Sequence, residues 1–229
     1  MVKKVILSGI VLFELALNTG WSQNKLSAIE NFKEPSGNWF EAANAILDSA
    51  DGNKLIAIDG MGVVISENGK TANLVTKQNY GDVKLALDFM ISKKSNSGVY
   101  LQGRYEIQIY DSWGTADPVS WDCGGIYERY DGTKTYEGTP PMVNASGEPG
   151  EWQHLEINFK APRFNSAGEK TKNAVFKKVK LNGIVIHKNA EVTGPTASSL
   201  DNKEEPSGPL MLQGDHGPVA YRNLKLKER

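Results

Sequence analysis

Polar residues alternate with apolar ones along residues 104–110, and the polar ones are of types that do chemistry. They are Arg104, Glu106 and Gln108. Successive side chains of a strand point to opposite faces, so these three share one face. A carboxylate can exchange a proton with a bound molecule, and Arg and Gln can hydrogen-bond its hydroxyl groups. The pattern predicts either a polar binding face or a face exposed to bulk water.

Asp111 is a candidate second carboxylate beside Glu106. By alternation it belongs to the opposite face, so it joins Glu106 only if a β-bulge lies between them. Bulges are common next to active sites. An irregularity at this end of the strand is therefore required if Asp111 is to join Glu106.

Aromatic residues surround this stretch in the sequence. They are Tyr100, Tyr105, Trp113, Trp121, Tyr127 and Tyr130. The apolar face of a sugar ring stacks on such side chains while its hydroxyls bond to polar groups, so the mixture suits a carbohydrate. Tyr100 and Trp113 are candidate binding residues, whereas Tyr105 and Trp121 are candidates for the core.

Histidine is scarce, with His154, His187 and His216 as its three examples. They are too scattered to predict a three-histidine metal site. His154 lies in an expected strand, which favours a structural role. His216 lies in a Gly-flanked turn, where a side chain can point into a groove, and is a candidate catalytic residue. Its neighbours Gln213 and Asp215 are candidate binding residues.

No metal or thiol chemistry is indicated. Asp111, Asp117 and Asp122 match no calcium-loop spacing. Cys123 is the single cysteine and has no histidine nearby in sequence, so neither a disulfide nor a thiol nucleophile is expected. The sequence requires no cofactor and leaves a role for a divalent metal ion open.

Short alternating segments must position these residues. The expected strands are 83–91, 97–101, 104–110, 151–159, 174–181, 184–187, 210–213 and 219–226, the last with an irregularity near Asn223. Gln102-Gly103 and Asn182-Gly183 are expected to close hairpins. Segments 112–136 and 193–208 are expected to be long loops, and Glu128 and Arg129 on the first are candidate binding residues.

The composition predicts an all-β protein. No long helical period appears, and 23 glycines and 10 prolines are spread along the chain. Antiparallel strands without covering helices must bury one face against another sheet. We therefore predict a two-layer antiparallel β-sandwich, a concanavalin-like jelly roll.

The N-terminal segment predicts an exported single domain, and the charge balance limits its partners. Lys3 and Lys4 precede an apolar stretch from Val5 to Leu17, so residues 1–22 are predicted to be a signal peptide, 23–38 a loose segment and 39–229 the sandwich. The expected location is periplasmic or secreted, with no membrane span. Basic residues (26) balance acidic ones (27), so nucleic acid is not an expected partner, and no protein partner is indicated.

The run from Asn96 to Asp111 resembles the signature of the 3-keto-disaccharide hydrolase family. Further blocks agree in order, among them 123–127, 149–153, 161–164 and 208–219. The resemblance implies a sandwich similar to concanavalin-type lectins and laminarinase-type glucanases. It also implies action on glucosides oxidised to a ketone at carbon 3, with elimination of the aglycone followed by hydration.

Two other functions stay open from the sequence alone. A non-catalytic carbohydrate-binding module would use the same aromatic and amide residues without a titrating group. A conventional glycoside hydrolase needs two carboxyl groups. The laminarinase-type pattern Glu-x-Asp-x-(x)-Glu here reads Glu106-x-Gln108-x-x-Asp111, and the amide at its centre disfavours direct hydrolysis.

Overall fold

The computed structural model describes residues 24–25, 29–33, 39–66 and 72–229, so the expected signal peptide and most of segment 23–38 lie outside the described residues. In chain order the elements are β1 (Asn24–Lys25), the 3₁₀ turn η1 (Ile29–Asn31), β2 (Trp39–Leu47), β3 (Leu55–Ser66), β4 (Leu74–Tyr80), β5 (Val83–Ile91), β6 (Asn96–Leu101), β7 (Tyr105–Tyr110), β8 (Arg129–Tyr130), β9 (Thr135–Tyr136), β10 (Gln153–Lys160), β11 (Arg163–Phe164), β12 (Lys170–Lys172), β13 (Ala174–Leu181), β14 (Ile184–Val192), β15 (Gly208–Leu212) and β16 (Val219–Glu228).

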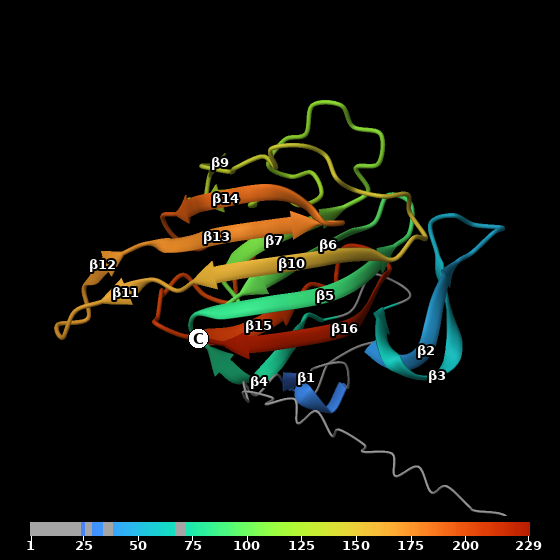
Figure 1. The fold of residues 1–229 in the computed structure, drawn as a ribbon, viewed down its shortest axis with the longest axis horizontal. Helices are drawn as coiled ribbons and strands as arrows, with labels where there is room; N and C mark the ends of the chain where they lie inside the picture. The colour runs from blue at the N-terminus through green and yellow to red at the C-terminus, as the bar shows by residue number, and fades with distance from the viewer. Residues whose placement is uncertain (1–23, 26–28, 34–38, 67–71) are drawn as a thin grey trace, which may run out of the picture.

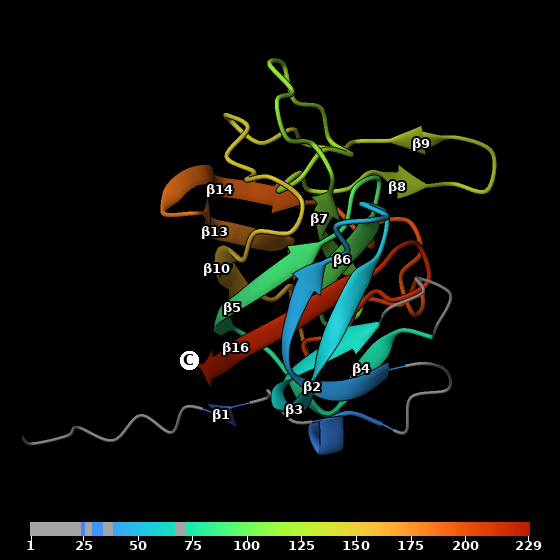
Figure 2. The same cartoon turned by 90° about the vertical axis from the view of Figure 1, so that its right-hand side faces the viewer.

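Two antiparallel sheets form the body. The large sheet has the order β14-β13-β10-β5-β16-β3-β2, with β1 added to β16, and the small sheet has the order β4-β15-β6-β7. Figure 1 looks onto the outer face of the large sheet, and Figure 2 shows the small sheet lying behind it. The predicted all-β antiparallel sandwich is confirmed.

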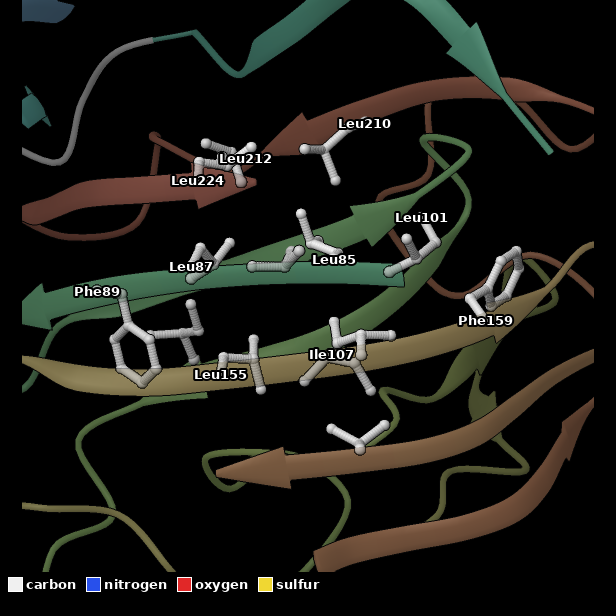
Figure 3. Close-up of a cluster of buried hydrophobic side chains, with 14 of the residues drawn as sticks. Leu85, Leu87, Phe89, Leu101, Ile107, Leu155, Phe159, Leu210, Leu212 and Leu224 are labelled. Carbon is white, nitrogen blue, oxygen red and sulfur yellow. The ribbon is translucent and has the colours of Figure 1, made fainter. Parts of the chain in front are cut away.

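The core lies between the sheets. Along β5, Val83, Leu85, Leu87 and Phe89 are buried, while Lys84, between the first two, is exposed. They face Ile107 of β7 and the apolar side chains of β15 (Figure 3). Burying one face of each sheet in this way is the main source of the stability of a sandwich.

The two predicted hairpins are present. Asn182 and Gly183 have φ values of 50° and 82°, as a tight two-residue turn requires, and Leu181 pairs with Ile184. In the other hairpin Leu101 pairs with Tyr105. β7 therefore begins one residue later than predicted, and Arg104 belongs to the turn.

Most other strand predictions are confirmed within one or two residues. In β16 the pairing with β5 shifts between Arg222 and Lys225, and Asn223 has a φ of 52°, which is the irregularity predicted there. Strand β3 was not predicted. Its pairing with β2 is interrupted around Gly60 and Gly62, whose φ values of 139° and 113° break the alternation that a sequence pattern detects.

The two predicted loops differ in regularity. Residues 193–207 contain no strand, whereas 112–136 contain the short hairpin of β8 and β9 and an isolated bridge from Ile126 to Ile107. In the described part of the chain no helix has the length and apolar character that crossing a bilayer requires.

Candidate active site

The polar residues of β7 lie on the outer face of the small sheet but are shielded from bulk water. Glu106 is 2% exposed and Gln108 3%. Tyr100 of β6 pairs with Glu106, and Met211 of β15 pairs with Tyr100, so the three form a row across the sheet. The alternative of a solvated polar face is therefore wrong.

Residues 124–127 extend the small sheet beyond β7 and cover one side of Gln108. The Gln108 amide donates to the Gly125 carbonyl, and the Gly124 amide donates to the Gln108 carbonyl, both at 2.8 Å. Buried His187 donates from Nε2 to the Gly124 carbonyl at 2.7 Å, and burial lowers the pKa of its ring. A neutral histidine thus holds this segment in place.

The loop 193–207 covers the start of β7. The Thr196 amide donates to the Arg104 carbonyl at 2.8 Å, and the Glu106 amide donates to Thr196 Oγ1 at 3.2 Å. Further along the loop, the Tyr100 hydroxyl donates to the Ala197 carbonyl at 3.3 Å. The loop therefore lies directly beside the pair formed by Tyr100 and Glu106.

Glu106 has an unusual protonation equilibrium. Burial raises the pKa of its carboxyl group, a hydrogen bond from Tyr100 lowers it, and the negative charge of Asp215 raises it, to about 8 in balance. Burial also raises the pKa of Tyr100 well above its usual value, and the charge of Glu106 adds to this. Near neutral pH Glu106 can therefore both give and take a proton, which is what general acid–base catalysis needs.

Gly98 makes room for the Glu106 carboxyl group. It pairs with Gln108 in the neighbouring strand, and a Cβ atom at residue 98 would collide with Glu106 Oε1. Its φ lies outside the left-handed region, so glycine is needed here for space and not for backbone conformation.

Two amide side chains lie next to this pair. Gln213 bonds through its backbone amide to the Gly98 carbonyl at 2.9 Å, while its side-chain Oε1 is buried without a hydrogen-bond partner. Gln108 Oε1 accepts from the Ile109 amide at 3.1 Å. A buried unpaired acceptor is costly, so Gln213 Oε1 is available to a hydroxyl group of a bound molecule.

Asp215 and His216 follow Gln213 in the chain. Both are exposed, and His216 Nδ1 is 2.6 Å from Asp215 Oδ1. The charge of Asp215 acts on Glu106 and Tyr100, and Glu106 also raises the pKa of half-buried Tyr127. Electrostatic interactions thus link Tyr100, Glu106, Asp215 and Tyr127.

Asp111 does not join them. The pairing of β6 with β7 runs without a register shift, so the required bulge is absent. The Asp111 carboxylate instead accepts from the Lys94 amide at 2.9 Å. The prediction of Asp111 as a catalytic residue is therefore corrected to a cap on the turn before β6.

Arg104, Glu128 and Arg129 form hydrogen bonds with residues of the loops. Arg104 donates to both carboxylate oxygens of Asp201, at 3.1 and 3.0 Å, which fixes loop 193–207. Glu128 accepts from Ser120 at 3.0 Å, and Arg129 donates to Thr193 at 2.7 Å. The predicted binding role of Arg104 is corrected to one of positioning, because its guanidinium group is already paired with Asp201. Binding by Glu128 and Arg129 stays a prediction, since Arg129 Nε is buried without a hydrogen-bond partner.

One of the two aromatic residues predicted for the core is buried and the other is exposed. Tyr105 is fully buried in the core, as expected. Trp121 is 51% exposed, so its assignment to the core is wrong, and Trp113 is 57% exposed on the loop after β7. Both tryptophans are free to stack on a ligand, but no described contact places either of them against Glu106.

Sequence reasoning gave no individual role to Gly98, Thr196 or His187. Gly98 and Tyr100 lie two residues apart and therefore on the same face of their strand. Hairpin pairing with the neighbouring strand would have placed Gly98 directly beside Gln108, on the polar face. No local signal identifies Thr196 or His187, because their partners lie 90 and 63 residues away.

Metal and thiol chemistry find no support in the geometry. Among the described residues no three His, Cys, Asp or Glu side chains gather as ligands. Cys123 is a buried free thiol, and burial raises its pKa to about 12, which disfavours the reactive thiolate.

Solved structures from Parabacteroides distasonis resemble this fold. A candidate glycosyl hydrolase is 25% identical, with a TM-score of 0.57, and the match covers 82% of this chain and 84% of that one. A second is 22% identical, with a TM-score of 0.56 and coverage of 91% and 100%. None of the curated proteins compared with the chain matches it.

The sequence also matches a family over nearly its whole length. The family is described as a 3-keto-alpha-glucoside-1,2-lyase-like domain, and the match spans residues 11–227. It includes every residue of the arrangement around Glu106. Together with the sandwich fold and the candidate glycosyl hydrolases, this supports a carbohydrate-active enzyme. The chain belongs to the family of 3-keto-alpha-glucoside-1,2-lyase-like domains.

Proposed function

We propose that the protein cleaves the glycosidic bond of glucosides that carry a ketone at carbon 3. The observation that carries the proposal is the buried carboxyl group of Glu106, whose pKa of about 8 suits it to moving a proton near neutral pH. The family match supports the same substrate class.

The reaction we propose is an elimination followed by hydration. The ketone acidifies the hydrogen on carbon 2, and ionised Glu106 takes that proton. The electron pair of the C–H bond passes through the enolate to form the double bond between carbons 1 and 2, and the C1–O bond breaks. The leaving oxygen takes up a proton, and water then adds at carbon 1.

Neighbouring groups fit the remaining tasks. The Tyr127 hydroxyl is a donor that can stabilise the negative charge of an enolate oxygen, whereas the Tyr100 hydroxyl already donates to the Ala197 carbonyl. Gln213 Oε1 is an unpaired acceptor for a sugar hydroxyl. His216, held by Asp215 at 2.6 Å, is a second group able to deliver a proton to the leaving oxygen.

Direct glycoside hydrolysis fits less well. That reaction uses two carboxyl groups on either side of the scissile bond. The position between Glu106 and Asp111 carries the amide Gln108, and Asp111 is bonded to Lys94. Asp215, whose charge acts on Glu106, is bonded to His216 at 2.6 Å, so Glu106 suits proton abstraction from an activated carbon better than a paired attack at carbon 1.

Turnover of a 3-keto α-glucoside and of its unoxidised parent tests the proposal. We expect release of the aglycone from the keto sugar alone, with kcat/KM rising with pH to a plateau above about pH 8 as Glu106 ionises. Glu106→Gln should lower kcat by about 100-fold or more. Cleavage of the parent alone, or full activity of Glu106→Gln, would overturn the proposal.

A glycine substitution offers a second probe of the same carboxyl group. Gly98→Ala should displace the Glu106 carboxyl and lower kcat to a similar extent, because the new Cβ atom would occupy its place. Gly81→Ala is the matched control, since its nearest neighbour is the Pro206 carbonyl at 3.4 Å. Saturable binding of the keto sugar without turnover would indicate a binding module instead.

A further inference from the structure

The outer face of the large sheet is rich in lysine and lies across the core from Glu106. Strand pairing places one row of side chains across β16, β5, β10, β13 and β14, a face that Figure 1 shows from the front. The row consists of Lys227, Lys84, Asn158, Lys178 and Lys188. Neighbouring strands lie about 4.8 Å apart, so the row is about 19 Å long.

Two adjoining grooves hollow this face. The smaller, of about 330 Å³, contains Asn158 and Lys178, and the larger, of about 760 Å³, continues past Lys160 towards β11 and β12. Five basic residues line each groove, against a single carboxylate in each, Glu156 and Glu191. The chain as a whole has a net charge of −1, so this excess of basic over acidic residues is local. We call the row and its two grooves the lysine face.

Much of this positive charge is not neutralised within the protein. Some of it is: Lys180 forms an ion pair with Glu156 at 3.2 Å, and Lys160 and Arg163 form ion pairs with Asp82. Among the described residues, six lysines of the lysine face have no ion-pair partner. They are Lys84, Lys172, Lys177, Lys178, Lys188 and Lys225.

The register sets like charges against each other. Lys84 stands directly opposite Lys227, and Lys178 directly opposite Lys188. Like charges in this position destabilise a sheet. Lysines that only kept the surface soluble would be interspersed with carboxylates, which removes this cost. An anion bound along the row would remove it as well.

Asn158, in the middle of the row, adds a neutral contact. Its side-chain Oδ1 is buried and has no hydrogen-bond partner, although the residue lines the smaller groove. A carbonyl oxygen of this kind needs a donor, and it repels anionic oxygens. The row therefore suits a ligand that carries hydroxyl groups between its negative charges.

We propose that the lysine face binds a linear polysaccharide that carries a carboxylate on most of its sugar residues. The lysines would pair with the carboxylates, and Asn158 would accept from a hydroxyl group. This binding is independent of the chemistry at Glu106. It would hold the protein on an acidic polymer while the other face meets its substrate.

The composition of the face favours such a polymer over nucleic acid. No aromatic side chain lines either groove, and the one arginine, Arg163, is paired with Asp82. Single-stranded nucleic acids are bound by stacking on aromatic rings, and phosphates are contacted preferentially by free arginines. Lysine is a compact point charge that suits scattered carboxylates.

Binding of the full chain to polygalacturonate tests the proposal. The double variant Lys84→Gln/Lys178→Gln should weaken binding at least 10-fold. The matched control Lys77→Gln/Lys134→Gln removes the same charge from β4 and the β8–β9 turn and should change it less than 2-fold. Binding should also weaken steeply as the salt concentration rises. Dextran, a neutral polymer, should not bind.

Two further measurements, of activity and of the unfolding midpoint, show whether the variants affect polymer binding alone. Both double variants should cleave a 3-keto glucoside as the wild type does, which separates this proposal from that for Glu106. The unfolding midpoint of Lys84→Gln/Lys178→Gln should be unchanged or higher, because the lysine repulsion is relieved. Equal weakening by both variants, equal binding of dextran, or tighter binding of a single-stranded DNA oligonucleotide would each overturn the proposal.

Discussion

Burial keeps the carboxyl group of Glu106 protonated over a pH range in which an exposed glutamate is ionised. Its pKa is about 8 in the folded protein, against 4.5 for the ordinary group. Between these values the folded state holds a proton that the unfolded state has lost, so the stability of the wild type falls as the pH rises. The site is thus maintained at the expense of stability.

Glu106→Gln should therefore stabilise the protein while removing activity. Glutamine stays neutral, so the gain over the wild type should grow by about 1.4 kcal/mol per pH unit between about pH 4.5 and 8 and then level off. Chemical denaturation at pH 5, 6, 7 and 8 measures it. Glu148→Gln, at an exposed loop residue, is the control and should show no such trend. A gain that does not depend on pH would contradict the burial of this carboxyl group.

Single residues were predictable where strand alternation decides their position. The polar face of Glu106 and Gln108 and the burial of Tyr105 follow from parity alone. The roles of Arg104 and Asp111 do not, because their partners Asp201 and Lys94 are set by how loops fold back on the sheet. A side chain's type shows what it can bind, while tertiary structure decides what it meets.

At the scale of elements, loop 193–207 is attached to the start of β7. Arg104 forms a bidentate ion pair with Asp201, and the Tyr105 hydroxyl donates to Glu204 at 2.6 Å. Because this loop also contacts Tyr100 through Ala197, its attachment controls the surroundings of Glu106. A change at Arg104 should therefore affect both stability and catalysis.

Arg104→Lys should lower the free energy of unfolding by about 1–2 kcal/mol. A lysine cannot bond both oxygens of Asp201, and the half-exposed Asp201 limits the loss. Limited proteolysis should cut more rapidly within 193–207, and KM for the keto sugar should rise. Arg163→Lys, at a more exposed arginine whose partner Asp82 also pairs with Lys160, is the control and should behave as the wild type. Unchanged proteolysis would show that the loop is held by other contacts.

Elements were predictable where their signals are local. Asn182-Gly183 has the two residues that a tight turn needs, so that hairpin is readable from the sequence. Strand β3 is not, because two glycines with positive φ interrupt its alternation. The strand-like extension at 124–127 was also missed, since its hydrogen bonds go to β7 and depend on the folded sheet.

At the scale of the whole molecule, Cys123 reports on global unfolding. Its side chain is buried in the main core, and burial raises its pKa to about 12. A thiol reagent should therefore modify the native protein about 1,000-fold or more slowly than the unfolded protein, with a rate that follows denaturant stability. Mass spectrometry of the labelled chain measures this. Rapid labelling under native conditions would show that the core around Cys123 opens locally.

The position of β16 in the large sheet has a consequence for biosynthesis. Its Arg222 bonds to Asp88 of β5 from 134 residues further along the chain, and β16 also separates β5 from β3. A ribosome adding about 5–20 residues per second needs about 7 to 27 seconds to make that interval. During this time β5 is present in the nascent chain without its central neighbour. We therefore expect the nascent chain to depend on chaperones that shield the unpaired edge of β5 until β16 has been synthesised.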